Sequence, residues 1–324
     1  MNLKRPMFLI TYRCNLRCKY CFYLTGDKKY QGTMSNSREE LTTNEIKELI
    51  LEPIRQLGIQ EIVISGGEPF MRRDISQVLK YISKMNMRCV LQSNLTMDID
   101  SVLNDSDILN STDFQISLDG IYEQNDILRG KGNYEKVLTN IRKIIKRCKE
   151  ENIKPSIQVN SVLTNQNIGS IGSFFKEMKS EEIDIFSFQL LSVNENNLKE
   201  NILSDTILDE LIKNAEKIRA MAAEKGTRVL FFPIDVNKEN KEYIKRWYNS
   251  LDLMPWHGCT YIEDRIRISP YGDVFSCVEK PFVNLKEINL VEALQDQNYI
   301  EFKDRIRTKG SMPECIRCCN YKFC

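Results

Sequence analysis

The sequence predicts an α/β protein with a parallel sheet, followed by a small cysteine-rich α+β region. Two observations lead to this prediction. Short apolar runs alternate with longer stretches of helical periodicity through the first part of the 324-residue chain, which is the pattern of repeated βαβ units. The last 66 residues then contain six of the eleven cysteines, around a segment with the pattern of a β-hairpin.

Six segments are predicted strands, because each is short, apolar and followed by polar or turn-forming residues. They cover residues 7–10, 61–64, 88–94, 113–120, 155–163 and 183–191. Residues 228–233 form a further candidate strand. In a parallel sheet, ligands bind beyond the C-terminal ends of the strands. The residues that fall at or near such ends are Cys14, Gly66, Asn94, Ser117, Asn160 and Gln189.

The segments between the strands have helical character. Residues 41–45 supply a capping residue followed by an acidic side chain, and Pro53 is expected to kink or break the helix that begins there. Further helices are predicted to begin near Asp74 and to include the apolar-periodic residues 137–145 and 205–223.

Three closely spaced cysteines, Cys14, Cys18 and Cys21, follow the first predicted strand. Thiolates at this spacing suit iron–sulfur ligation. Three protein ligands leave one iron of a four-iron cluster open, which is what a metal site needs if it is to do chemistry on another molecule. A structural zinc site or inert thiols are the alternatives. Zinc would require a fourth cysteine or histidine nearby, and the only histidine is His257.

The stretch from Gly66 to Pro69 comes directly after the second predicted strand. Its two glycines allow a close backbone approach to a ligand, and the carboxylate of Glu68 can accept hydrogen bonds from an ammonium group. Taken alone, such a stretch is more often only a turn.

The motif C-x3-C-x2-C with the aromatic Tyr20 before its third cysteine, followed by Gly-Gly-Glu-Pro, resembles the radical S-adenosylmethionine (SAM) enzymes. The resemblance implies a partial (β/α)6 TIM-like barrel whose three cysteines hold a [4Fe–4S] cluster. SAM would chelate the open iron and be cleaved reductively to a 5′-deoxyadenosyl radical that abstracts a hydrogen atom from the substrate. By the same resemblance, Gly66, Gly67 and Glu68 would contact the amino group of SAM.

The Ser-Leu-Asp-Gly strand end and the following Leu-Arg-Gly resemble the subgroup of these enzymes with auxiliary clusters. This implies that Ser117 and Arg129 contact the SAM carboxylate, with Asp119 nearby. An arginine fork suits a carboxylate, although a surface salt bridge is the alternative for Arg129. The predicted cofactor-binding residues are Tyr20, Gly66, Gly67, Glu68, Asn94, Ser117, Asp119, Arg129 and Gln189.

Cys259 and Cys277 flank the predicted hairpin, which turns at residues 269–273, and Cys315 and Cys318 form a C-x2-C pair. A hairpin brings its ends together, so these four thiolates can complete one metal site. A zinc ribbon-like site is the alternative. The arrangement resembles the Twitch and SPASM extensions of radical SAM enzymes, and it implies one auxiliary [4Fe–4S] cluster, because two clusters would need eight cysteines.

Cys319 and Cys324 are then unassigned. Each is a candidate for a replacement ligand, a structural cysteine or a hydrogen-atom donor of the kind found in radical SAM epimerases. We place residues 1–235 in the barrel with its linker helix and residues 236–324 in the auxiliary-cluster domain, which we expect to combine a β-hairpin with a helix.

The composition argues against several function classes. The formal net charge is +1, with both signs mixed along the chain, so neither nucleic acid nor membrane is a predicted partner. The N-terminus lacks the apolar run of a signal peptide, and no stretch approaches the roughly 18 apolar residues of a membrane helix. We therefore predict a cytoplasmic protein, in which cysteines serve as metal ligands or catalysts rather than in disulfides.

The predicted function is that of a radical SAM oxidoreductase that matures a ribosomally made peptide by oxidation or crosslinking. A dehydrogenase or epimerase of a small aminocyclitol or sugar is the alternative, and a non-enzymatic iron–sulfur electron carrier or redox sensor is a hypothesis from another class. The expected partners are a flavodoxin- or ferredoxin-type electron donor and the substrate. A separate leader-peptide-binding protein is a further candidate, because the first strand begins at about Met7.

Overall fold

The computed structural model describes residues 3–21, 38–252, 259, 261–277, 281–309 and 315. Its strands are β1 Met7–Thr11, β2 Glu61–Gly66, β3 Arg88–Ser93, β4 Thr112–Ser117, β5 Ile157–Leu163, β6 Ile185–Leu190, β7 Arg228–Phe232, β8 Arg267–Ile268, β9 Asp273–Phe275 and β10 Val283–Asn284. They form one sheet in the order β10-β9-β8-β1-β2-β3-β4-β5-β6-β7. All six predicted strands and the candidate seventh are therefore confirmed.

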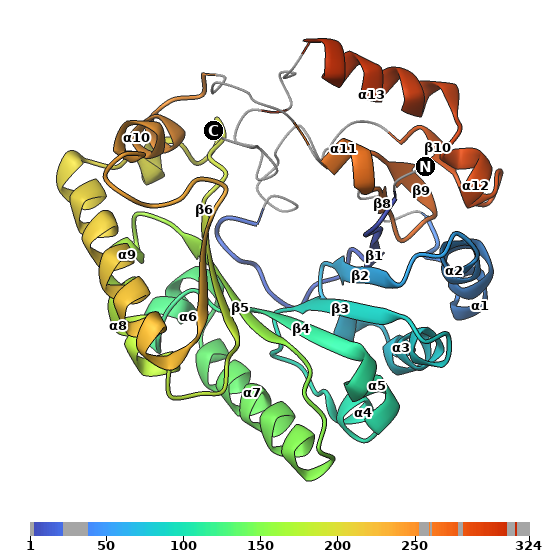
Figure 1. Cartoon of the computed structure of the whole chain (residues 1–324), viewed down its shortest axis with the longest axis horizontal. Coiled ribbons are helices and arrows are strands. Elements are labelled where there is room, and N and C mark those ends of the chain that lie inside the picture. Colours follow the sequence, from blue (N-terminus) through green and yellow to red (C-terminus); the bar gives the residue numbers. More distant parts are fainter. Residues whose placement is uncertain are drawn as a thin grey trace.

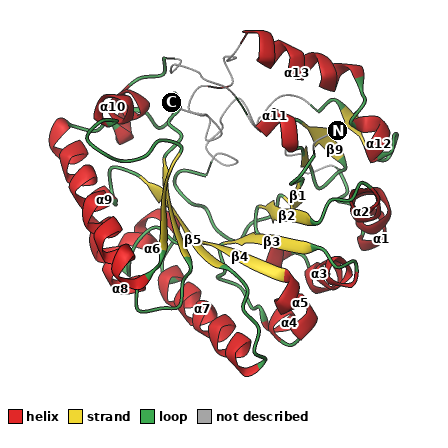
Figure 2. Cartoon of the chain, viewed as in Figure 1, coloured by secondary structure: helices red, strands yellow, loops and turns green. Residues whose placement is uncertain are grey.

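The strands β1 to β7 run parallel, and each pairs with the next in sequence. The main helices are α3 Ile75–Lys84, α5 Ser106–Ser111, α6 Glu123–Arg129, α7 Asn133–Glu150, α8 Ile171–Met178, α9 Asp205–Lys225, α10 Lys241–Asn249 and α13 Gln297–Lys309. Shorter helices are α1 Thr43–Ile46, α2 Glu52–Gln56, α4 Asp100–Leu103, α11 Tyr261–Asp264 and α12 Leu290–Ala293. The sheet curves, and the helices lie along its outer side (Figure 1; Figure 2). This arrangement confirms the predicted barrel-like α/β fold.

Burial alternates along the strands, which shows which side chains face the helices. On β6, the buried Phe186 and Phe188 contact Phe174 of α8 edge to face. Ser187 and Gln189 occupy the alternate positions and are only partly buried. Because successive side chains of a strand point to opposite faces, the polar set faces the inner side of the curved sheet.

The helical segment after β1 is interrupted where the sequence predicted a break. Thr42 and Glu45 form a capping box at the start of α1. Residues Lys47–Leu51 adopt a π-helical turn before α2 begins at Glu52, with Pro53 in its first turn. Proline has no N–H to donate and its ring crowds the preceding turn, so the regular hydrogen-bond ladder cannot run through it.

The C-terminal strands extend the sheet of the barrel at its first strand, because β8 pairs in parallel with β1. The hairpin prediction is correct for β8 and β9, which are antiparallel around a turn at Ser269–Gly272. It is wrong for residues 261–264, which form α11. Ile262 of this helix packs with Phe302 and Ile306 of α13, and this tertiary contact favours a helical turn there.

An ion pair joins the hairpin to the segment that leads into α1. Arg38 makes a two-pronged contact with Asp273, with N–O distances of 2.7 and 2.8 Å, and its guanidinium lies over the ring of Tyr271. No helix among the described residues is long and apolar enough to cross a membrane. The division at residues 235 and 236 stays a prediction.

Candidate active site

The three N-terminal cysteines lie in the segment that follows β1, residues 12–21, which we call the cluster loop. Its backbone lies against the Gly-Gly stretch: the N–H of Gly67 donates to Thr11 O at 2.7 Å and that of Glu68 to Arg13 O at 2.8 Å. A Cβ on Gly66 would lie 2.3 Å from Thr11 O, and one on Gly67 would lie 2.3 Å from Arg13 O. Gly66 is thus needed for the close approach of the end of β1 and Gly67 for that of the cluster loop, whatever they do toward SAM.

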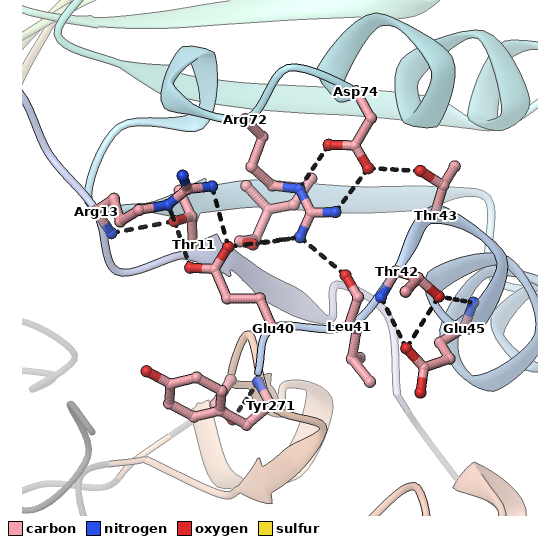
Figure 3. Close-up of polar contacts among 12 residues, drawn as sticks. Thr11, Arg13, Glu40, Leu41, Thr42, Thr43, Glu45, Arg72, Asp74 and Tyr271 are labelled. Carbon is pink, nitrogen blue, oxygen red and sulfur yellow. Dashed lines mark hydrogen bonds and ion pairs between the residues drawn. The ribbon is translucent and has the colours of Figure 1, made fainter. Parts of the chain in front are cut away.

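A buried arginine anchors the start of the cluster loop (Figure 3). Arg72 is 6% exposed. It donates to Ile10 O at 3.2 Å and Leu41 O at 3.0 Å, and it forms a two-pronged contact with Asp74 at 2.9 and 2.7 Å. Burial alone would raise the pKa of Asp74, but Arg72 and a hydroxyl group bring it down to about 2. The sequence analysis missed this network, because nothing in Arg72-Arg73-Asp74 indicates which arginine is buried.

Glu40 also holds the backbone at the start of the cluster loop in place (Figure 3). Its carboxylate accepts from the Thr11 hydroxyl at 2.6 Å and from Arg13 at 3.3 Å. The Thr11 hydroxyl also accepts from the Arg13 N–H at 3.1 Å. These contacts fix the backbone immediately before Cys14, so the segment that leads into α1 helps to position the first thiol.

We expect Arg72→Met to destabilise the protein by about 3–5 kcal/mol, because it leaves the carboxylate of Asp74 without its buried partner and frees two carbonyl groups. Urea unfolding of the metal-free protein measures this. Arg73→Met is the matched control, since the neighbouring Arg73 is exposed, and it should cost less than about 0.5 kcal/mol. Equal losses in the two variants would contradict the anchor.

The thiols of the cluster loop are partly buried and lie near one another. The N–H of Cys21 donates to Cys18 O at 3.1 Å, and the thiol of Cys14 accepts from the Leu16 N–H at 3.5 Å. Burial raises the pKa of Cys18 to about 11, and the neighbouring Cys21 and Cys14 add to the rise. Partly buried thiols this close together fit a centre whose positive irons stabilise them as thiolates.

No group of three or more cysteine, histidine, aspartate or glutamate side chains in the described part of the chain could hold a single metal ion. In a four-iron cluster, each protein thiolate binds a different iron, so the three thiols do not need to converge on one ion. The donor set of the cluster loop therefore fits a cluster.

Glu68 is fully buried, and both of its carboxylate oxygens are engaged by the chain. The Ser93 hydroxyl donates to one oxygen at 2.8 Å, as does the Phe70 N–H at 3.1 Å, and the Asn94 N–H donates to the other at 2.7 Å. The carboxylate thus joins the end of β2 to the end of β3. Its predicted contact with the SAM ammonium stays a prediction.

Burial raises the pKa of Glu68 to about 7, although its three donors oppose the rise. A carboxyl group with a raised folded-state pKa contributes stability that is present below about pH 4.5 and is lost as the pH rises toward 7. We expect the stability of the wild type relative to Glu68→Gln to fall by up to about 3 kcal/mol over this range and then to stay constant. Urea unfolding at several pH values measures it. Glu48→Gln is the control, because Glu48 is exposed. If the unfolding free energies of the wild type and Glu68→Gln changed in parallel with pH, the expectation would be refuted.

Asn94, which follows β3, connects this strand to the cluster loop. Its side-chain amide donates to Asn15 Oδ1 at 3.0 Å and lies 3.9 Å from the sulfur of Cys14. Its oxygen accepts from the Thr96 hydroxyl at 2.7 Å. Asn94 is therefore close enough to Cys14 to orient its sulfur.

Asp119 and Arg129 form a buried ion pair beside the cluster loop. Arg129 donates to Asp119 through Nε at 2.6 Å and Nη2 at 3.2 Å. The Tyr20 hydroxyl also donates to Asp119, and the Val162 N–H donates to it at 2.7 Å. Arg129 is 8% exposed and Asp119 is fully buried. Burial alone would lower the pKa of Arg129, but the carboxylate of Asp119 outweighs this effect, so the pKa is raised. Burial also raises the pKa of Tyr20.

This pair excludes a surface salt bridge for Arg129, because its partner Asp119 is fully buried beside the cluster loop. The contact of Arg129 with the SAM carboxylate stays a prediction. Ser117 ends β4 two residues before Asp119, on the inner face of the sheet. Gln189 lies on the same face of β6, opposite Phe232 of β7. The structure thus gathers Tyr20, Asn94, Asp119 and Arg129 at the cluster loop, and it places Gln189 farther along the sheet.

Cys259, Cys277 and Cys315 all pack against one small apolar cluster, made by Ile262 of α11 with Phe302 and Ile306 of α13. This common surface supports the prediction that they serve one auxiliary site. The three other C-terminal cysteines with predicted roles lie outside the described residues: Cys318, Cys319 and Cys324. Cys89 and Cys148 are buried in the core.

Two family models match the chain. Residues 8–149 match the radical SAM superfamily, and residues 259–319 match SPASM, an iron–sulfur cluster-binding domain. The chain therefore carries a radical SAM domain followed by a C-terminal SPASM domain. It is an enzyme whose cofactors are SAM, a [4Fe–4S] cluster and auxiliary iron–sulfur clusters. The number of auxiliary clusters stays a prediction.

Named relatives differ in what they make. The chain is 27% identical over 354 residues to the Fe-coproporphyrin III synthase of Methanosarcina barkeri, covering 99% of this chain and 83% of the relative. It is 27% identical over 169 residues to the mycofactocin maturase MftC of Mycolicibacterium smegmatis, covering 51% of this chain and 39% of the relative.

Among solved structures, SuiB of Streptococcus suis bound to S-adenosylmethionine has a TM-score of 0.71 at 17% identity, covering 98% of this chain and 72% of SuiB. The structure of SuiB bound to its precursor peptide SuiA has a TM-score of 0.65 at 17% identity, covering 93% and 66% of the two chains. At this identity the likeness establishes the fold.

Proposed function

We propose that this enzyme oxidises or crosslinks a ribosomally made peptide. When bound, the cluster and SAM would supply a 5′-deoxyadenosyl radical for hydrogen abstraction from the substrate, and an auxiliary cluster would supply an acceptor for the electron that the substrate radical must lose. The cluster loop, held by Arg72 and Glu40, positions the thiols. Arg129, held by Asp119, would bind the SAM carboxylate. A flavodoxin- or ferredoxin-type protein donates the first electron, and a separate protein can present the leader peptide.

The observation that carries the peptide assignment is a row of side-chain amides across the inner face of the sheet, which we call the amide row: Gln92, Gln115, Gln158 and Asn160. Gln92 donates to Gln115 at 2.8 Å, Gln115 to Gln158 at 3.5 Å, and Gln158 to Asn160 at 2.6 Å. An amide side chain both donates and accepts hydrogen bonds, as a peptide group does. The amide row is therefore chemically matched to a peptide backbone.

The charge of the same face also supports a peptide over a substrate with several carboxylates. The inner-facing positions of β4, β5 and β6 contain no lysine or arginine, and Arg88 at the start of β3, on the face of Gln92, is paired with Asp113. Carboxylate groups are usually bound by such cations. SuiB, whose fold this chain shares, was solved with its precursor peptide, and MftC is named a maturase.

Tetrapyrrole synthesis is the second candidate, favoured by the relative named Fe-coproporphyrin III synthase, which aligns over nearly the whole chain. Short peptides encoded beside the gene and a panel of carboxylate-bearing tetrapyrroles can be compared with the reconstituted, reduced enzyme. We expect a peptide to accelerate 5′-deoxyadenosine release and to lose hydrogen atoms, detected by mass spectrometry. Acceleration by a tetrapyrrole alone would overturn the proposal.

A further inference from the structure

The last strand of the barrel differs from its neighbours on the inner face. Along β7, Phe231 is stacked on Phe188 with ring centroids 5.2 Å apart, and the guanidinium of Arg219 in α9 lies 4.8 Å from its ring centre. Phe231 therefore faces the helices. Because side chains alternate along a strand, Leu230 and Phe232 face the inner side of the sheet.

The pairing of β6 with β7 confirms this placement. Leu230 lies opposite Ser187, and Phe232 lies opposite Gln189. Both polar partners belong to the inner set of β6, since Phe186 and Phe188 between them face α8. The inner face thus changes from mainly polar side chains on β4 to β6 to two large apolar side chains on β7, which follow Arg228 at the start of that strand.

These two side chains remain accessible. Leu230 is 41% exposed and Phe232 is 37% exposed. The other large exposed apolar side chains in the described ranges lie on helices or loops: Tyr122, Ile127, Ile202, Tyr243, Val291 and Ile300. Leu230 and Phe232 are thus the pair that comes from one face of one strand, and that face is continuous with the amide row and with Gln189.

We propose that Leu230 and Phe232 determine substrate specificity by contacting a large apolar side chain of the peptide, while the amide row binds its backbone. This inference rests on the proposed function. An apolar side chain placed against Leu230 and Phe232 removes their accessible surface from water, which favours binding. The amide row ends on β5, and Ser187 and Gln189 of β6 lie between it and β7. The peptide backbone would therefore bind across β3 to β6 while its apolar side chain contacts β7.

A displayed library of random peptides, selected on the immobilised SAM-loaded enzyme, tests this. We expect the wild type to enrich peptides with a large apolar residue at one position. Phe232→Ala should reduce that preference about tenfold or more, since hydrophobic pockets discriminate by about this factor. Phe232→Leu should keep an apolar preference with a different preferred size, which a merely structural role would not produce.

Val291→Ala is the matched control, because Val291 has the same 37% exposure but lies on α12, and it should select the wild-type peptides. Thermal unfolding of each variant checks that it is folded. If the wild type enriches no peptide, the proposed function itself is overturned. If it enriches peptides that Phe232→Ala and Leu230→Ala select equally well, or enriches charged residues at every position, only the specificity role is overturned.

Discussion

Replacing any one of Cys14, Cys18 and Cys21 by alanine is expected to abolish SAM-dependent release of 5′-deoxyadenosine under reducing conditions. Loss of one thiolate leaves a second iron without a protein ligand and removes the match between three ligands and one open position. Loss of an outer-shell partner costs about 10- to 100-fold in a metal site, so removal of a ligand should cost more. Chromatography of the reaction products after anaerobic reconstitution measures the release.

Cys148→Ala is the control for this comparison. Cys148 is buried at 5% exposure on α7, so its replacement removes a cysteine from the core without touching the cluster loop. It should retain release near the wild-type rate. Release that persists in Cys18→Ala would exclude the cluster loop as the site of SAM cleavage.

Asp119→Ala is expected to destabilise the protein by about 3–5 kcal/mol, because it leaves the guanidinium of Arg129 as an unpaired buried charge. The same change frees the Tyr20 hydroxyl and the Val162 N–H, which both donate to Asp119. Tyr20 belongs to the cluster loop, so binding of SAM to the reconstituted enzyme should weaken as well. Urea unfolding of the metal-free protein and equilibrium binding of SAM separate the two effects.

Two further variants make the Asp119 result interpretable. The double change Asp119→Leu with Arg129→Met removes both charges, so it should be more stable than Asp119→Ala while still binding SAM poorly. Glu182→Gln breaks the exposed pair with Lys149, whose side chains are 58% and 61% exposed, and should cost no more than about 1 kcal/mol. If Asp119→Ala were as mild as Glu182→Gln, the ion pair would not be a structural element of the site.

Much of the fold could be predicted from local pattern. The strands β1 to β7 are short apolar runs ended by polar residues, so their existence follows from composition and their order from chain connectivity. The break near Pro53 follows from its missing N–H. The pairing of β8 with β1 could not be predicted, because a two-residue strand has too little pattern to identify its partner. Residues 261–264 became helical through contacts with α13, which are remote in sequence.

The site was predictable where the spacing of residues indicates the chemistry, as it does for Cys14, Cys18 and Cys21. It was not predictable where a side chain interacts with other residues of the protein and holds them in place. Arg72 resembles its exposed neighbour Arg73, and only the fold buries it. Glu68 and Arg129 have partners in the structure, Ser93 and Asp119, that motif reasoning did not pair with them. Gly66 and Gly67 are required by the cluster loop, a reason that no local signal provides.

The iron and sulfide content after anaerobic reconstitution tests the central claim most directly, when the wild type is compared with a variant in which Cys14, Cys18 and Cys21 are all alanine. We expect the variant to lose about four irons and four sulfides per chain, in keeping with one four-iron cluster on the cluster loop, and to retain those of the SPASM domain. With one auxiliary cluster, the content falls from about eight irons to about four. An unchanged iron content in the variant would contradict the assignment of the cluster to these three cysteines.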